Sequence, residues 1–315
     1  MSAARRSHFE RLVAAVTAIP PVVTAVAHPC NATALAGAIE AAQAGIIAPI
    51  LVGPRARIES TAAEAGLDLS AYELVEAPHS HAAAEQAVAL VREGRAETLM
   101  KGSLGTDELL AAVVRRDTGL RTERRLSHCF VLDVPGYAKP LLITDAAINI
   151  FPTLEEKVDI VQNAIDLARC LGIKPPKVAI LSAMEKVNPK LLSTIEAAAL
   201  CKMAERGQIT GGLLDGPLAL DNAIDPEAAR IKGIGGPVAG QADILVVPDL
   251  EAGNLLAKSL AFLMGADSAG IVLGARVPIT LTSRADSIQS RLASAAVAAL
   301  VARRRQAATA LDAVA

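Results

Sequence analysis

Strand-like and helix-like patterns alternate along almost the whole chain, and this alternation limits its fold more than any other feature. The apolar run 46–52, ending at Gly53-Pro54, has the length and composition of a strand buried on both faces. A helical pattern precedes it and another follows it, and the same order continues to about residue 116. Strands alternating with helices predict a parallel sheet covered by helices on both faces. We therefore expect an α/β protein.

The second half of the chain repeats this alternation. It begins with a strong helical pattern at 154–171 and ends with short strand patterns at 271–273 and 279–281. Between the halves, the strand patterns 129–134 and 140–143 are joined through Pro135-Gly136, which is typical of a hairpin. The 315 residues are enough for two medium-sized domains. No low-complexity linker appears, so we expect short crossings near 145–152 and 278.

Composition excludes several classes of function. Aromatic residues make up only 2% of the chain and Trp is absent, which disfavours a base-stacking surface for nucleic acid. The net charge of −2 gives no general attraction to nucleic acid or to an anionic membrane. No apolar run reaches the roughly 18 residues of a membrane-spanning helix. An export signal after Arg5-Arg6 is disfavoured, because Glu10, Arg11 and Pro20-Pro21 interrupt the apolar stretch.

The four cysteines are widely separated and form no CxxC pair, so we expect free thiols in a reducing, cytoplasmic setting. The histidines show no metal-ligand spacing, and we expect no metal site. The chain also lacks a GxGxxG loop after a strand, a phosphate-binding GxxxxGK[ST] loop, an HExxH pair and a GxSxG elbow. The common nucleotide-binding, metalloprotease and serine-hydrolase patterns are therefore absent.

The segment after 279–281 is the most distinctive strand end. It contains Ser283, Arg284, Asp286 and Ser287, and a helical pattern begins at residue 288. Ligands of open α/β sheets bind beyond the carboxyl ends of the strands, and the start of a helix attracts anions. Two interpretations stay open here. Asp286 or Ser287 caps the helix, or the segment forms a reactive site.

Other strand ends carry polar side chains in the same way. Together they outline a cleft that suits a phosphate-bearing substrate and a separate proton-transfer group; the set consists of Lys101, Asp145, Asn149, Glu185, Asp215, Asp221, Glu251, Asn254, Ser283, Arg284 and Asp286. Five arginines also fall within 115–125. Such a run is either a phosphate clamp or a solvated loop, and we favour the loop because charged runs usually face water.

Five segments, taken in order, resemble the phosphate acetyltransferase/phosphate butyryltransferase family over nearly the whole chain. They are Lys101-Gly102, Thr144-Asp145-Ala146-Ala147-Ile148-Asn149-Ile150, Asp215-Gly216-Pro217-Leu218-Ala219-Leu220-Asp221, Leu250-Glu251-Ala252-Gly253-Asn254 and Thr282-Ser283-Arg284-Ala285-Asp286-Ser287. The resemblance implies two doubly wound α/β domains of the isocitrate/isopropylmalate dehydrogenase-like fold, with the active site in the interdomain cleft. It places 1–145 plus 280–315 in the first domain and 146–279 in the second, with the C-terminal helix packed on the first. It also implies a homodimer.

The activity implied is reversible transfer of a short acyl group between CoA and inorganic phosphate. The partners would be acyl-CoA or CoA and phosphate or acyl phosphate, with CoA a substrate and no tightly bound cofactor. For this reaction we assign Asp286 as the base for the CoA thiol, Ser283 as a hydrogen-bond donor to the oxyanion and Arg284 as the residue that holds the phosphate or CoA. The substrate- or CoA-binding residues expected from the matching segments are Lys101, Gly102, Asp145, Asn149, Asp215, Asp221, Glu251, Asn254 and Thr282.

The sequence leaves the identity of the acyl group undecided. The segments 152–157, 187–190 and 282–287 are similar to the butyryltransferase branch, and Leu110 stands where the acetyl branch carries an Arg. Many relatives of this mixed type are nonetheless acetyltransferases.

Two alternatives to acyl transfer are weighed: an NAD-dependent decarboxylating dehydrogenase of the same fold, and a non-catalytic acyl-CoA-binding protein. The first needs a metal held by clustered aspartates on one helix, which the sequence lacks, and the second has no need of a base beside a thiol.

Overall fold

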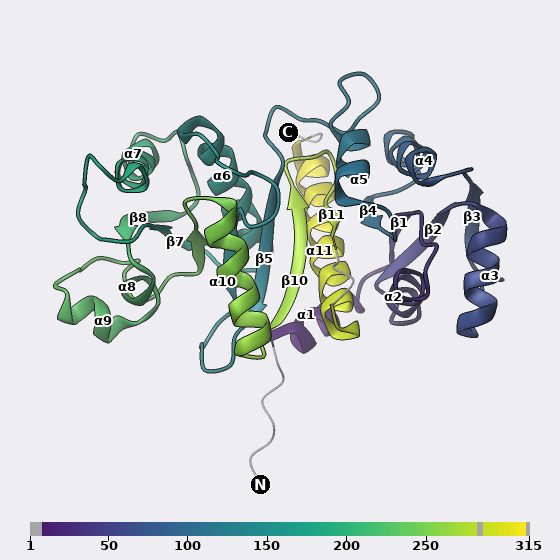
Figure 1. The fold of residues 1–315 in the computed structure, drawn as a ribbon, viewed down its shortest axis with the longest axis horizontal. Coiled ribbons are helices and arrows are strands. Elements are labelled where there is room, and N and C mark those ends of the chain that lie inside the picture. The colour runs from purple at the N-terminus through teal and green to yellow at the C-terminus, as the bar shows by residue number, and fades with distance from the viewer. Residues whose placement is uncertain (1–7, 282–285, 313–315) are drawn as a thin grey trace, which may run out of the picture. The chain divides into compact units, whose positions relative to one another are not determined.

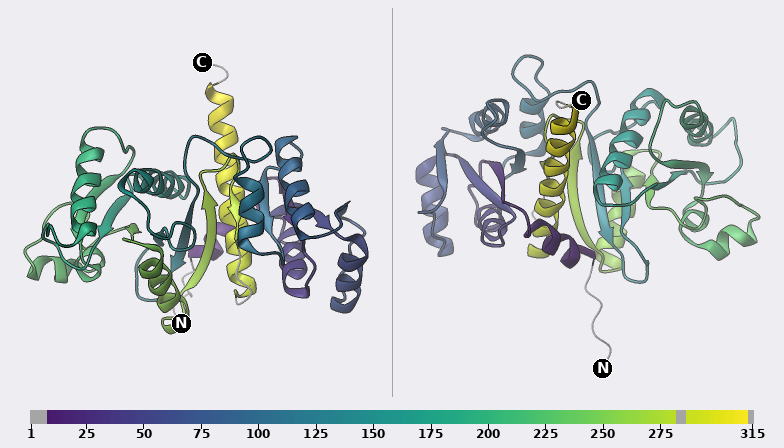
Figure 2. Two further views of the ribbon diagram at one scale, coloured as in Figure 1. Left: turned by 45° about the horizontal axis from the view of Figure 1, so that its top comes forward. Right: turned by 180° about the vertical axis from the view of Figure 1, so that it is seen from behind.

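The computed structural model describes residues 8–281 and 286–312, and side chains as far as residue 307. The chain forms two compact units (Figures 1 and 2). Unit 1 contains residues 1–124 and 269–315, and unit 2 contains residues 125–268. No helix within the described residues is both long enough and apolar enough to span a membrane.

Unit 1 is built on a mostly parallel sheet. Its strand order is β3-β2-β1-β4-β11-β10, in which β10 alone, within the described residues, runs antiparallel to its neighbour. The strands are β1 (Val22–Ala27), β2 (Ile47–Gly53), β3 (Glu73–Glu76), β4 (Thr98–Lys101), β11 (Ile279–Thr280) and β10 (Asp267–Leu273), whose first two residues belong to unit 2. The helices are α1 (His8–Val16), α2 (Ala32–Gln43), α3 (Arg55–Ala65), α4 (Ser80–Arg92), α5 (Thr106–Val113) and α11 (Ile288–Asp312). Helices α2 and α4 lie on opposite sides of β1 and β2 (Figure 1), as the predicted alternation requires.

Unit 2 has the strand order β5-β6-β9-β7-β8. Strands β5 (Ser127–Asp133) and β6 (Leu141–Thr144) form the predicted antiparallel hairpin, and β9 (Ile244–Val246), β7 (Lys177–Leu181) and β8 (Leu213–Leu218) run parallel to β6. The helices are α6 (Leu154–Cys170), α7 (Leu192–Glu205), α8 (Leu220–Ile224), α9 (Pro226–Ile231) and α10 (Leu250–Leu263). Helices α7 and α8 lie on opposite sides of β7 and β8 (Figure 1).

Small side chains let α11 pack closely in unit 1. Ala295, Ala296 and Ala299 are buried in one apolar cluster with Val22 of β1 and Leu35 of α2. Each buried methyl contributes about 25 cal/mol per Å² removed from water, and the absence of longer chains lets the helix approach closely. The C-terminal helix thus packs on elements from the first 124 residues, as the family resemblance implies.

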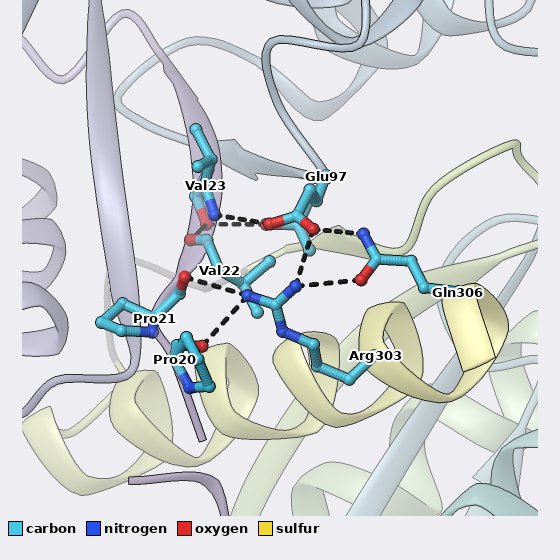
Figure 3. A network of polar contacts seen from close by, with 9 residues as sticks. Pro20, Pro21, Val22, Val23, Glu97, Arg303 and Gln306 are labelled. Carbon is cyan, nitrogen blue, oxygen red and sulfur yellow. Dashed lines mark hydrogen bonds and ion pairs between the residues drawn. The ribbon is translucent and has the colours of Figure 1, made fainter. Parts of the chain in front are cut away.

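A polar network joins the second half of α11 to the amino ends of two strands (Figure 3). The Nη1 atom of Arg303 donates to Glu97 Oε1 at 2.9 Å, and its Nη2 atom donates to the carbonyls of Pro20 and Pro21, each at 3.1 Å. The other oxygen of Glu97 accepts the backbone N–H of Val23 at 3.0 Å. One carboxylate therefore links the helix to the beginning of β1.

Polar side chains cap the first turns of α2, α6 and α11. Asn31 accepts the N–H of Ala34 at 2.8 Å and caps α2. Ser287 accepts the N–H of Ser290 at 3.1 Å and so caps α11, which confirms that part of the cap interpretation. Thr153 and Glu156 form a reciprocal capping box at the start of α6.

The prediction that Asp215 lies at the end of a strand was wrong. Strand β8 continues through Asp215, Gly216 and Pro217 to Leu218. Proline lacks the N–H that an interior strand needs, but β8 is the last strand in the order of unit 2, where one side has no ladder to form. The predicted strand end at Asp215 is therefore an interior position.

Candidate active site

In unit 2, the loops that follow β6 and β9 are joined at one edge of the sheet. These strands are parallel, with Thr144 beside Val246, so their carboxyl ends coincide. The N–H of Leu250 donates to the carbonyl of Ile150 at 3.0 Å, and Asn254 donates from Nδ2 to the carbonyl of Ala146 at 3.1 Å. Asn254 therefore anchors α10 to loop 145–150.

Asp145 organises this loop. Its side chain is 3% exposed, and its two oxygens accept the backbone N–H groups of His128, Ala147, Ile148 and Asn149 at 2.9–3.3 Å. The side-chain amide of Asn149 donates to the same carboxylate at 2.5 Å. Because five N–H groups already surround Asp145, it suits holding the loop better than exchanging a proton with a substrate.

Asn149 connects this buried carboxylate to an arginine. Its Nδ2 atom also donates to the carbonyl of Leu126 at 2.9 Å, and its Oδ1 atom accepts the Nε–H of Arg125 at 2.6 Å. Arg125 Nη1 lies 2.7 Å from Glu156 Oε1. Arg125 was not among the predicted site residues. It precedes β5, whose antiparallel pairing with β6 brings the start of β5 to the end of β6.

Two further predicted residues occupy the start of α10. Glu251 is exposed in the first turn, next to the cap residue Asp249, which accepts the N–H of Ala252 at 2.9 Å. A side chain at Gly253 would place its Cβ 2.9 Å from the carbonyl oxygen of Asp145. The glycine therefore allows α10 to lie directly against loop 145–150.

Asp215 and Asp221 have separate surroundings. Asp215 lies within β8, where burial raises the pKa of its carboxyl and the N–H of Gly216 donates to it at 2.8 Å. Asp221, in α8, contacts Lys232, which lies 2.7 Å from Glu185 and 2.9 Å from Asp221. The hydrogen bonds from Lys232 lower the pKa of both carboxyls. Glu185, named among the strand-end residues, therefore joins Asp221 through this lysine.

In unit 1, the loops after β1 and β4 form hydrogen bonds with each other beside Lys101. The N–H of Gly102 donates to the carbonyl of Ala27, and the N–H of Ser103 to that of His28, both at 2.9 Å. A Cβ on Gly102 would lie 2.3 Å from the Ala27 oxygen, so only glycine fits this predicted position. Lys101 is half-buried, and its ammonium lies 3.3 Å from the carbonyl of Gly102.

His28 is a residue at this edge that the sequence analysis missed. It has a φ of 53°, which is strained for a residue other than glycine. The hydroxyl of Ser103 donates to the His28 carbonyl at 2.7 Å, which leaves its oxygen to accept from His28 Nδ1 at 3.2 Å. The neutral ring then carries its proton on Nδ1. Burial, and secondarily the charge of Arg57, lower the pKa of His28 and favour this neutral form.

Strand β11, which precedes the predicted catalytic residues in the sequence, ends at this same edge. Thr280 of β11 pairs in parallel with Met100 of β4, so the chain emerges beside Lys101. Thr282, Ser283 and Arg284 lie outside the described residues. Asp286 is half-buried, and its backbone carbonyl accepts from Arg291 Nη2 at 2.8 Å. Arg291 also donates to the Thr33 carbonyl at 3.2 Å, which places the start of α11 next to the start of α2.

Among the side chains that the structure describes, no three from His, Cys, Asp or Glu are grouped to hold a metal ion. All four cysteines are free thiols.

Comparison with known proteins decides the family. The sequence profile of the family described as "Phosphate acetyl/butaryl transferase" matches residues 80–299. The chain belongs to this family. It is 68% identical to a phosphate acetyltransferase of Rhizobium meliloti over 305 residues, which cover 97% of this chain and 96% of the relative. It is 44% identical to a phosphate butyryltransferase of Clostridium acetobutylicum over 263 residues, or 84% of this chain and 87% of the relative.

The solved structures agree. The crystal structure of a branched-chain phosphotransacylase from Enterococcus faecalis V583 superposes with a TM-score of 0.78 at 33% identity, covering 89% of this chain and 99% of that one. The family assignment made from the five sequence segments is thereby confirmed, and this member of the family is a phosphate acyltransferase. Neither the dehydrogenase nor the non-catalytic alternative is favoured by these relatives.

Proposed function

We propose that this phosphate acyltransferase uses the acetyl group: acetyl-CoA and inorganic phosphate are converted reversibly to acetyl phosphate and CoA. The observation that carries the proposal is the 68% identity with a phosphate acetyltransferase, against 44% with a butyryltransferase. Two of the segments that resemble the butyryl branch have structural contacts that account for them. Thr153 and Glu156 cap α6, and Asn188 forms the turn before α7 through contacts with Lys190 and Thr194.

We propose further that the two units are domains of the isocitrate/isopropylmalate dehydrogenase-like type, with the active site in the cleft between them. Support comes from the polar edges found separately in the two units. One carries Lys101 and Asp286, and the other carries Asn149 and Asn254. We retain the prediction of a homodimer in the cytoplasm, with CoA as a substrate and no tightly bound cofactor.

Asp286 is the proposed base. In the direction of acetyl-CoA synthesis, the CoA thiol transfers its proton to the carboxylate, and the thiolate attacks the carbonyl carbon of acetyl phosphate. The C–O bond to phosphate then breaks and phosphate leaves. A free thiol has a pKa near 8.5, so a base increases the fraction of the reactive thiolate at neutral pH.

Ser283 and Arg284 complete the proposed chemistry. Ser283 donates a hydrogen bond to the oxyanion of the tetrahedral intermediate, a contact worth about 3 kcal/mol. Arg284 binds the phosphate group with the paired N–H geometry that lysine lacks. Thr282, Lys101, Gly102 and the unit 2 residues Asp145, Asn149, Asp215, Asp221, Glu251 and Asn254 are proposed to bind or orient substrate or CoA.

The experiment is phosphate-dependent release of CoA thiol, measured in parallel with acetyl-CoA and butyryl-CoA. We expect release with both substrates and a kcat/KM for acetyl-CoA at least about 10-fold higher, equivalent to about 1.4 kcal/mol of transition-state binding. A higher kcat/KM for butyryl-CoA would overturn the acetyl assignment but retain acyl transfer. The absence of phosphate-dependent release from folded protein would overturn both.

A further inference from the structure

We propose that Arg125 binds a phosphate group of the substrates, and that Asp145 and Asn149 orient its guanidinium for this contact. This inference rests on the proposed function. It selects one residue from the arginine-rich run 115–125, which the sequence analysis treated as a solvated loop.

The position of Arg125 comes from the β5–β6 hairpin. Cys129 pairs with Thr144, so the residues before β5 lie beside the loop that follows β6. That loop lies at the carboxyl edge of the parallel strands β6 and β9, where ligands of α/β sheets bind. Arg125 therefore lies at the ligand edge of unit 2 although it precedes its strand.

The orientation of the guanidinium is fixed in two steps. A carboxylate only accepts hydrogen bonds, so Asp145 requires the NH₂ group of Asn149 to face it, at 2.5 Å. The amide oxygen of Asn149 then points the other way and accepts Arg125 Nε–H at 2.6 Å. Asp145 and Asn149 are both buried, which makes this orientation costly to change.

Donors remain on Arg125 after these contacts. A guanidinium has five N–H groups. Asn149 accepts the Nε–H, and Nη1 forms an ion pair with Glu156 Oε1 at 2.7 Å, while the other oxygen of Glu156 accepts the N–H of Thr153. Neither Nη2 donor has a hydrogen-bond partner among the residues that the structure describes, and the side chain is 47% exposed. The two hydrogens of Nη2 diverge within the guanidinium plane, so each can donate a charge-assisted hydrogen bond to a phosphate oxygen.

Arg115, in the same run, is a matched control. It lies beyond the end of α5 in unit 1 and pairs at 2.6 Å with Glu85, and both side chains are about half exposed. Glu85 therefore balances the charge of Arg115 at the surface, where such ion pairs contribute little to stability.

The test is a set of kinetic and binding measurements on wild type, Arg125→Lys, Arg125→Gln, Asn149→Ala and Arg115→Gln. KM is measured separately for phosphate, acetyl phosphate and CoA, and calorimetry gives Kd for CoA and for phosphate without turnover. We expect Arg125→Gln to raise KM and Kd for one phosphate-bearing substrate by about 10- to 100-fold, Arg125→Lys by less, and Asn149→Ala in the same direction. Arg115→Gln should leave these values unchanged.

The substrate that responds identifies the phosphate group. A change for phosphate and acetyl phosphate means that Arg125 binds the transferred group. A change for CoA alone, lost with CoA that lacks the 3′-phosphate, means that it binds CoA. Values within about 2-fold of wild type for every substrate in both Arg125 variants would overturn the inference. Wild type that binds these compounds without transferring acetyl would refute the proposed function alone, since the Kd values still test Arg125.

Discussion

Asp145 and Asp286 illustrate how two carboxylates at strand ends come to serve different purposes. Asp145 is buried among five N–H donors and holds a loop. Asp286 is half-buried beside the cap of α11, at the edge where the chain leaves β11 next to Lys101. The sequence alone treats both as polar residues after a strand, because the number of donors around a carboxylate depends on loop geometry.

Asp286→Asn tests the assignment of the base. We expect kcat to fall by about 10²- to 10⁴-fold with KM for CoA changed by only a few fold, because the amide keeps the shape but cannot accept the thiol proton. Steady-state kinetics measures both. Ser287→Ala is the control, since loss of the α11 cap should lower stability by about 1 kcal/mol while kcat is retained. Wild-type kcat in Asp286→Asn would rule Asp286 out as the base.

His128 gives a prediction about pH and stability. Burial lowers its pKa to about 4, with the nearby Asp145 carboxylate acting in the opposite direction, and its Nδ1 atom has no hydrogen-bond partner among the described residues. An unfolded histidine titrates near 6.5. As pH falls from about 6.5 to 4, the unfolded chain therefore binds a proton that the native chain does not, and the free energy of unfolding decreases by up to roughly 3 kcal/mol.

Urea unfolding of wild type and His128→Leu at pH 7.5, 6, 5 and 4 measures this effect. We expect the variant to lose stability less steeply below pH 6.5, because leucine fills a similar volume without a titrating group. Carboxylates that titrate in the same range affect both proteins, so the difference between the two slopes is the quantity to compare. Equal slopes would show that His128 does not bind a proton on unfolding in this range.

At the scale of elements, the sequence predicted most helices and strands but not all of their limits. The apolar run 46–52 predicted β2 well, because the pattern of a buried strand is set within a few residues. The predicted end of β8 was too early, because Asp-Gly-Pro is typical of a turn. Pro217 fits within this strand because β8 is the last strand in the order of unit 2.

Arg125 was missed for a related reason. A charged run favours a solvated loop whenever neighbouring residues alone are considered. Its contacts with Asn149 and Glu156 depend on the antiparallel hairpin, which brings residues 24 and 31 positions away to the same edge. The hairpin itself was predicted from Pro135-Gly136, so the antiparallel order was the one available indication that the residues before β5 reach the ligand edge.

The network in Figure 3 gives a prediction about helix α11. Arg303→Met keeps the apolar length of the side chain but removes the donors to Glu97 and to the carbonyls of Pro20 and Pro21. We expect the free energy of unfolding to fall by about 1–3 kcal/mol, because partly buried acceptors lose their partners. Denaturant unfolding measures this loss. Arg230→Met, which removes an exposed ion pair with Glu227 on α9, should cost less than about 0.5 kcal/mol; equal losses in both variants would contradict a specific role for the network.

At the scale of the whole molecule, the order of five short segments predicted the family, and the comparisons confirm it. The identity of the acyl group was harder to predict from the sequence. Segments such as 152–157 resemble the butyryl branch, yet Thr153 and Glu156 cap a helix, and such contacts are independent of substrate length. Resemblance at these positions therefore reports local structure as much as specificity.

The central claim is that the chain joins acetyl to phosphate, and product identification tests it most directly. Purified protein is incubated with acetyl-CoA and inorganic phosphate, and the phosphorus NMR spectrum is followed together with the release of CoA thiol. The account predicts acetyl phosphate and free CoA in equal amounts, and regeneration of acetyl-CoA when acetyl phosphate and CoA are supplied instead. Release of CoA with acetate and no acetyl phosphate would show a thioesterase and contradict the account.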